Sequence, residues 1–170
     1  MAIQPSEARC SMSPRQKIFQ KRSNLRDMVL VNDHRWYCAI PHLNDLLYRI
    51  MQLMPIPATI CLDNDQTIRR LNDEYRDKNR PTNVLSFERF DGTAGGDIIL
   101  ALQTVRREAL ANRKPIRHHF AHLVIHGLLH LQGYDHITID EARQMEMKEA
   151  RLMHMLGFPN PWKINFIRSI

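Results

Sequence analysis

The fold class follows from the stretch PTNVLSFERFDGTAGGDIILAL, residues 81–102. Its two apolar segments, Val84–Phe87 and Asp97–Leu102, are typical of β-strands, and a glycine-rich loop joins them. Two earlier runs, 28–33 and 57–65, contain apolar and β-branched residues and end in turn residues, so they predict two further strands. The sequence therefore predicts a sheet of mainly four strands.

Apolar residues at helical spacing predict about five helices around these strands. Pro41 falls in the first turn of the first helix, Asp65 caps the second, and Gly133 marks the end of the fourth. Gly157 and Pro159 stop the last helix. The predicted ranges are Trp36–Leu53, 65–76, Gln103–Asn112, Ile116–Leu131 and Thr138–Leu156. Together the elements predict a single α+β domain, with the helices packed on a four-stranded mixed sheet.

The composition is that of one globular domain. The chain has 170 residues, of which 44% are hydrophobic and 25% charged, and this length is sufficient to bury a core. No uninterrupted apolar run is longer than the five residues Ile98–Leu102, which is much too short for a membrane span, and the N-terminus does not resemble a secretory signal. We therefore expect a soluble cytoplasmic protein with no membrane partner.

The three cysteines do not indicate disulfide chemistry. Cys10, Cys38 and Cys61 are odd in number, widely spaced and include no CxxC pair. This pattern argues against both a disulfide framework and a thiolate zinc site. We expect reduced, mostly buried thiols and no disulfide-linked partner.

The positive charge is concentrated near the N-terminus. Residues 1–26 carry a net charge of +5 out of +6 for the whole chain, so the remainder is almost neutral. This segment has no sustained apolar period, and it predicts a flexible basic extension that either contacts RNA or has no partner. Met28 opens the first predicted strand, so a translation start at Met28 is an alternative explanation.

Three histidines in HGLLHLQGYDH, residues 126–136, have the spacing of a metal site. His126 and His130 are four residues apart, so a helix places both imidazoles on one face with Cβ atoms about 6 Å apart. Gly133 lets the chain leave the helix and turn back, which brings His136 to the same point. Three nitrogen ligands with an open fourth position predict a catalytic zinc site. For the first two histidines alone, a surface pair is the alternative.

The residue after the first histidine distinguishes this stretch from a zinc peptidase. Metzincin peptidases follow H-E-x-x-H-x-x-G-x-x-H, and this sequence keeps every position except the glutamate, which is Gly127 here. Glycine cannot transfer the protons for which a peptidase uses that carboxylate. Phosphodiester cleavage instead requires stabilisation of negative charge on phosphoryl oxygens, which a metal and an arginine supply. The pattern therefore favours a nuclease.

Three ordered motifs resemble the YbeY family of bacterial zinc-dependent endoribonucleases. The motifs are LNDEYRDKNRPTNVLSF (71–87), GDIIL (96–100) and HGLLHLQGYDH, and the resemblance covers about Met28–Phe158. It implies a zincin-like α+β fold and cleavage of single-stranded RNA in rRNA processing, particularly 16S rRNA 3′-end maturation, and in ribosome quality control. It also implies one zinc ion bound by the histidine triad, and the ribosome or small-subunit assembly intermediates as partners.

Arg76, in EYRDK, matches the functional arginine of that family, so the resemblance implies a catalytic role for it. At the end of a helix its guanidinium would bind a phosphate with both charge and orientation. A surface ion pair with Asp73 or Asp77 is the alternative. Lys78 and Arg80 extend the same basic segment and are candidate RNA-binding residues.

Two further residues are candidates for supporting the metal site. His122 lies one turn before His126 and is either a supporting or proton-transfer group or a buried structural histidine. Asp135 would orient a ligand imidazole or cap the following turn. Two positions depart from the family pattern: Gly95 replaces a bulky apolar residue and Glu88 a common proline. The resemblance therefore does not specify the shape of the cleft rim or the fit of the substrate.

The predicted organisation is a flexible basic extension (1–26), a YbeY-like catalytic domain (27–160) and a C-terminal tail (161–170). Two rival functions use the same residues differently. A zinc peptidase would keep the histidine spacing without its usual base, and a non-catalytic ribosome-assembly factor would use the metal structurally. Cleavage of a defined RNA, with a triad variant in parallel, would distinguish these functions.

Overall fold

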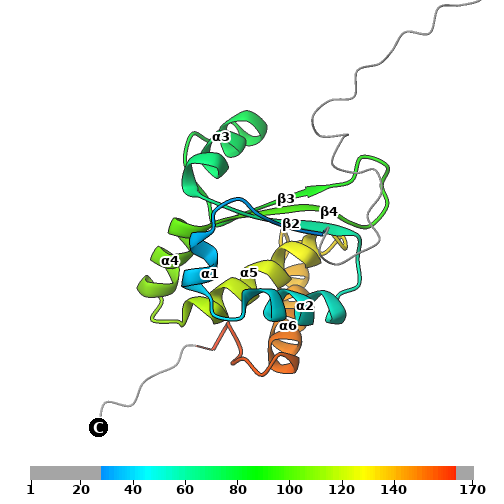
Figure 1. Cartoon of the computed structure of the whole chain (residues 1–170). Helices are drawn as coiled ribbons and strands as arrows, with labels where there is room; N and C mark the ends of the chain where they lie inside the picture. Colours follow the sequence, from blue (N-terminus) through cyan, green and yellow to red (C-terminus); the bar gives the residue numbers. More distant parts are fainter. Residues whose placement is uncertain (1–27, 164–170) are drawn as a thin grey trace, which may run out of the picture.

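The computed structural model describes residues 28–163. The predictions for the basic extension, residues 1–26, and for Cys10 therefore lie outside the described residues. Within the described part, helices and strands are interspersed along the chain, and the helices pack around one sheet (Figure 1). The predicted α+β class is confirmed.

Four strands form one mixed sheet, as predicted. The strands are β1 (Val29–Val31), β2 (Ala58–Asp63), β3 (Val84–Glu88) and β4 (Gly96–Ala101). Their order across the sheet is β1-β2-β4-β3. β1 and β4 both run parallel to β2, whereas β3 is antiparallel to β4 and forms one edge of the sheet.

Six helices pack around this sheet, one more than predicted. They are α1 (Arg35–Ala39), α2 (Leu43–Leu53), α3 (Asp65–Arg76), α4 (Leu102–Ala111), α5 (Ile116–His130) and α6 (Ile139–Met155). The prediction of one helix over Trp36–Leu53 is wrong, because a residue before proline avoids the helical conformation. Ile40, before Pro41, is extended at φ −129° and ψ 98°, and His42 is left-handed at φ 56°. The chain therefore turns between α1 and α2.

The start of α3 differs from the prediction in its cap. Its bounds agree with the predicted range, but the capping residue is Asn64, whose Oδ1 accepts a hydrogen bond from the backbone N–H of Thr67 at 3.0 Å. Asp65 is already helical, and its carboxylate accepts a hydrogen bond from the backbone N–H of Thr104 at 2.9 Å. Asp65 therefore links the start of α3 to α4.

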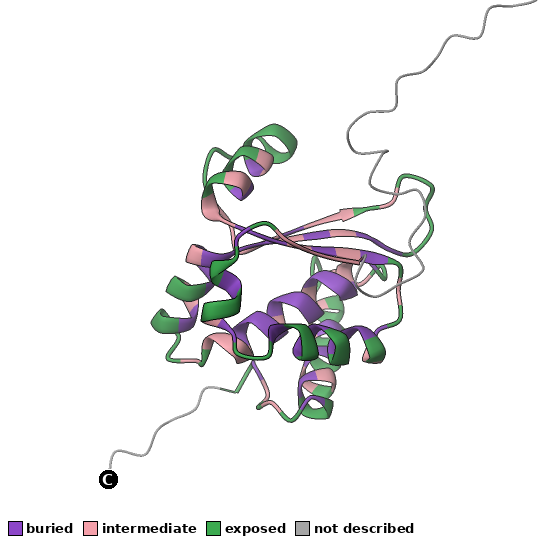
Figure 2. Ribbon diagram, viewed as in Figure 1, coloured by how far each residue is buried: buried purple, intermediate pink, exposed green. Residues whose placement is uncertain are grey.

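Successive side chains of β4 point to opposite faces of the sheet, and both faces are apolar. Ile98 and Leu100 pack into the main core, which includes residues of α2 and α5. Ile99 and Ala101 pack on the opposite face, in a smaller cluster with Ile68 of α3. Nine of the 15 residues of α5 are buried, and Figure 2 shows this helix as the buried centre of the larger layer. α5 is therefore held in place by the core along most of its length.

None of the described helices combines the length and the apolar character needed to cross a bilayer. In the described part of the chain, Cys38 and Cys61 are both free thiols. Cys38 is exposed, so the expectation of a buried thiol is wrong for it. Cys61 is partly buried. The pKa of its thiol is raised to about 12, mainly by burial and to a smaller extent by the negative charges of Asp63 and Asp97.

Gly127 lets α5 lie close to the sheet. A Cβ at this position would stand 3.0 Å from Ile98 Cγ2 on β4 and 3.1 Å from Ser86 Oγ on β3. Ordinary contacts between non-bonded carbon atoms are about 3.5–4.0 Å, so even a methyl group would displace its neighbours. The position faces the sheet, and a long side chain there would enter a packed interface.

The Gly127→Glu variant is expected to be destabilised, because the side chain overpacks this interface and buries a carboxylate. The expected loss in the free energy of unfolding is about 2 kcal/mol or more, measured by urea denaturation. Gln144→Glu is the control, since it introduces a carboxylate at an exposed position of α6 and should cost less than about 0.5 kcal/mol. Equal losses in the two variants would contradict the packing described for Gly127.

Candidate metal centre

Three histidines from α5 and the loop after it lie close enough to share one metal ion. His126, His130 and His136 each offer a ring nitrogen, and these atoms all lie within 4.8 Å of one another. The Nε2 atoms of His126 and His130 are 3.2 Å apart. The 3.2 Å separation suits two ligands of one tetrahedral zinc ion held by bonds of about 2.0–2.1 Å, and the nitrogen of His136 is near enough to reach the same ion after a small side-chain movement. The residues present therefore fit the predicted ion.

The turn after α5 returns the chain to this point. The helix ends at His130, and Gly133 follows in left-handed backbone at φ 86°, which glycine adopts without steric cost. Asp135 Oδ1 then accepts a hydrogen bond from the backbone N–H of His136 at 2.8 Å. As a result, the ring centroids of His130 and His136 are 5.1 Å apart.

The surroundings of His130 favour its neutral form. Burial lowers the pKa of this imidazole, and the nearby His126 and His136 lower it further, while Asp135 opposes them. A metal binds the unprotonated nitrogen. His130 therefore does not have to lose a proton at neutral pH before it can act as a ligand.

A buried carboxylate on α6 supports the triad, and the sequence analysis missed it. Glu149 is 0% exposed, and its Oε1 lies 2.7 Å from His126 Nδ1. Burial by itself raises the pKa of Glu149, but hydrogen bonds from His122 and His126 outweigh it and lower the pKa to about 2. The ionised carboxylate accepts the Nδ1 proton of His126, which leaves Nε2 available to a metal.

Two further donors satisfy the second oxygen of this carboxylate. His122 Nε2 lies 3.1 Å from Glu149 Oε2, and Trp162 Nε1 donates a hydrogen bond to the same oxygen at 2.8 Å. The rings of Trp162 and His122 meet edge to face, with centroids 5.4 Å apart. Since Trp162 lies beyond the predicted domain end at residue 160, the packed part of the chain extends into the predicted tail.

The sequence contained a signal for Glu149. Met145, Glu149 and Met153 recur at four-residue intervals along α6, and all three are buried. An acidic residue on an otherwise apolar helix face requires a buried partner, and α5 is rich in histidine. The partner nevertheless depends on how α6 crosses α5, which spacing within one helix does not specify.

The two candidate supporting residues occupy different positions. His122 is mostly buried, with its side chain 14% exposed, and it reaches the site through Glu149. Asp135 caps the turn through the backbone of His136, and it affects the site by raising the pKa of His130 against the effect of burial. Both residues therefore adjoin the triad, each by a different route.

Arg76, Lys78 and Arg80 are exposed at the end of α3 and in the loop that follows it. They lie apart from the triad, because α3 and α5 cover opposite faces of the sheet (Figure 1). Within residues 28–163, Arg76 forms no ion pair with Asp73 or Asp77 and no contact with the triad. Its guanidinium therefore faces solvent.

Gly95, one of the two departures from the family pattern, is required by the local backbone. Its φ is +119°, and an added Cβ would stand 2.4 Å from the carbonyl oxygen of Pro57. Its N–H donates to the carbonyl of Leu131 at 3.2 Å, which joins the start of β4 to the end of α5. Glu88, the other departure, is an exposed residue at the end of β3, paired with Gly96.

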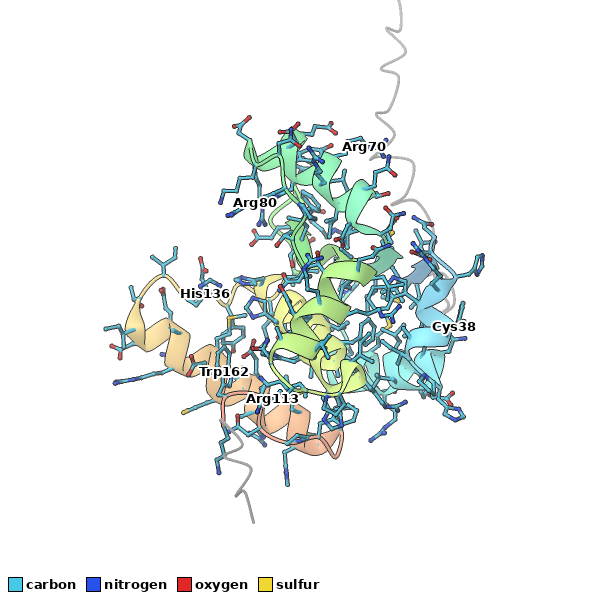
Figure 3. All side chains as sticks on the ribbon, turned by 90° about the vertical axis from the view of Figure 1, so that its left-hand side faces the viewer. Cys38, Arg70, Arg80, Arg113, His136 and Trp162 are labelled. Carbon is cyan, nitrogen blue, oxygen red and sulfur yellow. The ribbon has the colours of Figure 1, made fainter. Side chains whose placement is uncertain are left out.

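A cleft of about 320 Å³ gives access to the triad beside α6. Its walls combine two rings of the triad with the carboxylate that contacts one of them and with an indole that is 47% exposed. The lining residues are His126, His136, Ala142, Met145, Glu146, Glu149 and Trp162. Figure 3 shows His136 and Trp162 on the same side of the molecule.

Fold and site together define an α+β domain whose three histidines, backed by a buried carboxylate, can hold a metal ion. Residues 35–157 match the family described as Endoribonuclease YbeY. The chain belongs to this family. The resemblance found in its sequence motifs is therefore confirmed.

Known relatives agree with this assignment. Endoribonuclease YbeY of Gluconobacter oxydans is 43% identical over 146 residues, which span 79% of this chain and 86% of the relative. That of Magnetococcus marinus is 44% identical over 125 residues, or 65% of this chain and 85% of the relative. The solution structure of TM1509 from Thermotoga maritima has a TM-score of 0.52 at 21% identity, covering 80% and 99% of the two chains. This last likeness concerns the fold alone.

The Glu149→Gln variant is expected to bind zinc about tenfold more weakly or worse, because it loses the charge that holds the His126 ring. A competition titration against a chromophoric chelator measures the Kd. Glu146→Gln is the matched control, since Glu146 lines the same cleft from the same helix and should leave the Kd unchanged. Equal zinc affinity in the two variants would remove the supporting role from Glu149.

Proposed function

We propose that this chain is a zinc-dependent, single-strand-specific endoribonuclease of the cytoplasm. Its proposed tasks are rRNA processing, with 16S rRNA 3′-end maturation in particular, and ribosome quality control, so its partners are the ribosome or small-subunit assembly intermediates. The convergence of His126, His130 and His136 carries this proposal. The naming of its relatives as Endoribonuclease YbeY supports it.

Zinc is the proposed ion because three histidine nitrogens leave one position open for a reacting group. When bound, it supplies Lewis-acid chemistry, which stabilises charge on a phosphoryl oxygen and lowers the pKa of water. In the chain itself, α5 holds His126 and His130 at a constant spacing, because this helix is packed into the core. Glu149 orients the His126 ring through Nδ1.

Arg76 is the proposed catalytic arginine, and it would bind a phosphate of the RNA strand. α3 and α5 both contact β3, which is the edge strand of the sheet. An RNA strand that reaches both Arg76 and the triad would therefore cross this edge. Figure 3 shows Arg80 and His136 toward the same side of the molecule. A flexible single strand follows such a bend more readily than a stiff duplex.

Two routes of cleavage fit the proposed site. In one, water attacks the phosphodiester; in the other, the adjacent 2′-hydroxyl of the RNA attacks and a 2′,3′-cyclic phosphate results. Gly127 cannot accept the proton in either route, and it faces the sheet. Mapping the product ends distinguishes the routes, because a cyclic phosphate excludes direct attack by water.

The His126→Ala variant is expected to lose zinc and RNA cleavage together, since it removes a ligand from the triad. Elemental analysis gives the metal content, and a defined single-stranded RNA incubated with zinc-loaded protein gives the activity. His154→Ala is the control, because His154 is an exposed histidine of α6 and should leave both unchanged. Full RNase activity in metal-free His126→Ala protein would refute the zinc assignment.

The same preparations separate the proposal from its rivals. If the chain were a zinc peptidase, the wild-type protein would hydrolyse casein. We expect no such hydrolysis. A non-catalytic ribosome-assembly factor would leave the RNA intact and would bind ribosomes equally well after the triad is changed.

The Arg76→Ala variant is expected to retain zinc but to cleave RNA about 100-fold more slowly, because a positive charge that stabilises the phosphoryl group is removed. Single-turnover cleavage rates and metal content measure the two effects. Arg70→Ala removes an exposed arginine from another face of the same helix, so it controls for general loss of charge. Wild-type turnover in Arg76→Ala would refute the proposed role.

A further inference from the structure

A second pocket, of about 230 Å³, lies beside the metal centre and is not used by the proposed reaction. It is enclosed between the start of α5, the loop before it and the chain segment that follows α6. Its lining residues are Arg113, Lys114, Pro115, His118, His119, His122, Met153, Pro159, Asn160, Pro161 and Lys163. We call it the basic pocket.

Specific contacts hold the walls of the basic pocket together. Lys114 Nζ donates a hydrogen bond to the carbonyl of Pro161 at 2.7 Å, which ties the segment after α6 to the residue before the N-cap of α5. The rings of His118 and Phe158 pack at an angle of 41° to each other, with centroids 4.7 Å apart. The pocket is therefore a formed cavity rather than a gap between loose chain ends.

The lining of the basic pocket is strongly biased in charge. Three cationic side chains, Arg113, Lys114 and Lys163, and three histidines contribute to it, whereas its described lining includes no carboxylate. Two carboxylates lie behind this lining, where Glu108 contacts His119 and Glu149 contacts His122. Among the described residues, neither forms an ion pair with Arg113 or Lys163. Positive charge without an internal counter-charge favours an anionic ligand.

A buried histidine in this lining has an unused nitrogen. His119 is 8% exposed, and its Nε2 lies 2.9 Å from Glu108 Oε2. Its Nδ1 is buried and has no hydrogen-bond partner among the described residues. Buried polar atoms are usually satisfied, so this nitrogen indicates a missing partner. Burial lowers the pKa of His119, so its neutral ring donates from Nε2 to Glu108 and leaves Nδ1 to accept a hydrogen bond from a ligand O–H, such as that of a singly protonated phosphate.

The helix terminus and the size of the pocket point to the same kind of anion. Pro115 is the N-cap of α5, and a helix N-terminus carries partial positive charge that favours phosphate. Pockets that enclose drug-sized ligands have volumes of about 300–1,000 Å³. The smaller volume here suits one phosphate group better than a whole nucleotide.

The basic pocket is also connected to the metal centre. His122 lines the pocket and contacts Glu149, which in turn contacts the metal-ligand candidate His126. Trp162 lines the cleft over the triad, and its chain neighbours Pro161 and Lys163 line the basic pocket.

We propose that the basic pocket binds a phosphate group, supplied by the RNA strand whose scissile bond lies at the triad or by free phosphate. The RNA source rests on the function proposed above. A strand held in this way would be anchored at a phosphate outside the cleaved bond, so the pocket would help to determine which bond reaches the metal.

Binding to zinc-loaded protein tests this proposal in two arms. The first follows a fluorescent single-stranded RNA by anisotropy over a range of salt concentrations, with a gel to verify that the RNA stays intact. The second titrates inorganic phosphate by calorimetry. Arg113→Asn and Lys163→Gln each remove one pocket charge, and asparagine tolerates the φ of 51° at position 113. Arg151→Gln removes an exposed charge from α6 and is the control.

In the pocket variants we expect the RNA Kd to rise about tenfold. The slope of log Kd against log salt should also fall by about 0.7 for each RNA phosphate that the variant no longer neutralises, while Arg151→Gln leaves it unchanged. Weaker binding of inorganic phosphate with unchanged RNA affinity would support the pocket and identify free phosphate as its ligand. If both pocket variants bind RNA and phosphate as Arg151→Gln does, the proposal is overturned.

These measurements are independent of the cleavage reaction. If the wild-type protein does not cleave RNA but its RNA affinity depends on Arg113 and Lys163, the proposed nuclease function fails and the phosphate pocket stands. If RNA is cleaved and neither variant changes binding, the pocket proposal fails and the nuclease function stands.

Discussion

The contact between Glu149 and His126 joins the two helices on which the metal centre depends. The carboxylate is completely buried, and a buried anion is costly unless its oxygens accept hydrogen bonds. His126 supplies one such bond across the α5–α6 interface, and His122 and Trp162 supply the others. The hydrogen bonds that satisfy this carboxylate therefore orient the ring of His126, a candidate metal ligand, and also attach the segment after α6 to the domain.

The same stretch of α5 serves both the core and the metal centre because adjacent helix positions point in different directions. His126 faces the cleft, whereas Gly127 faces β3 and β4, where little room is left even for a methyl group. Helix–sheet packing thus explains the glycine at position 127, which is the residue that most clearly distinguishes this sequence from a zinc peptidase. A glutamate at this position would meet the sheet instead of the triad.

Local patterns predicted most of the secondary structure, and their errors have local causes. The ranges of α3, α5 and α6 agree closely with the predicted ones, because each helix has clear apolar spacing and an identifiable end. Pro41 was the exception, since its effect on Ile40 divides the first predicted helix into two. Glu149 was not predicted as a site residue. The spacing of α6 indicates that it is buried, but it does not indicate which residues contact it.

The sequence by itself determined the order of the elements and the meeting of His126, His130 and His136, because that geometry arises within one helix, one glycine turn and eleven residues. Only the tertiary structure decided that Glu149 and Trp162 support this site, that Arg76 lies across the sheet from it, and that cationic residues enclose a second pocket. The physical reason is that these contacts depend on how helices far apart in the chain cross one another. Periodicity within a single element carries no information about that crossing.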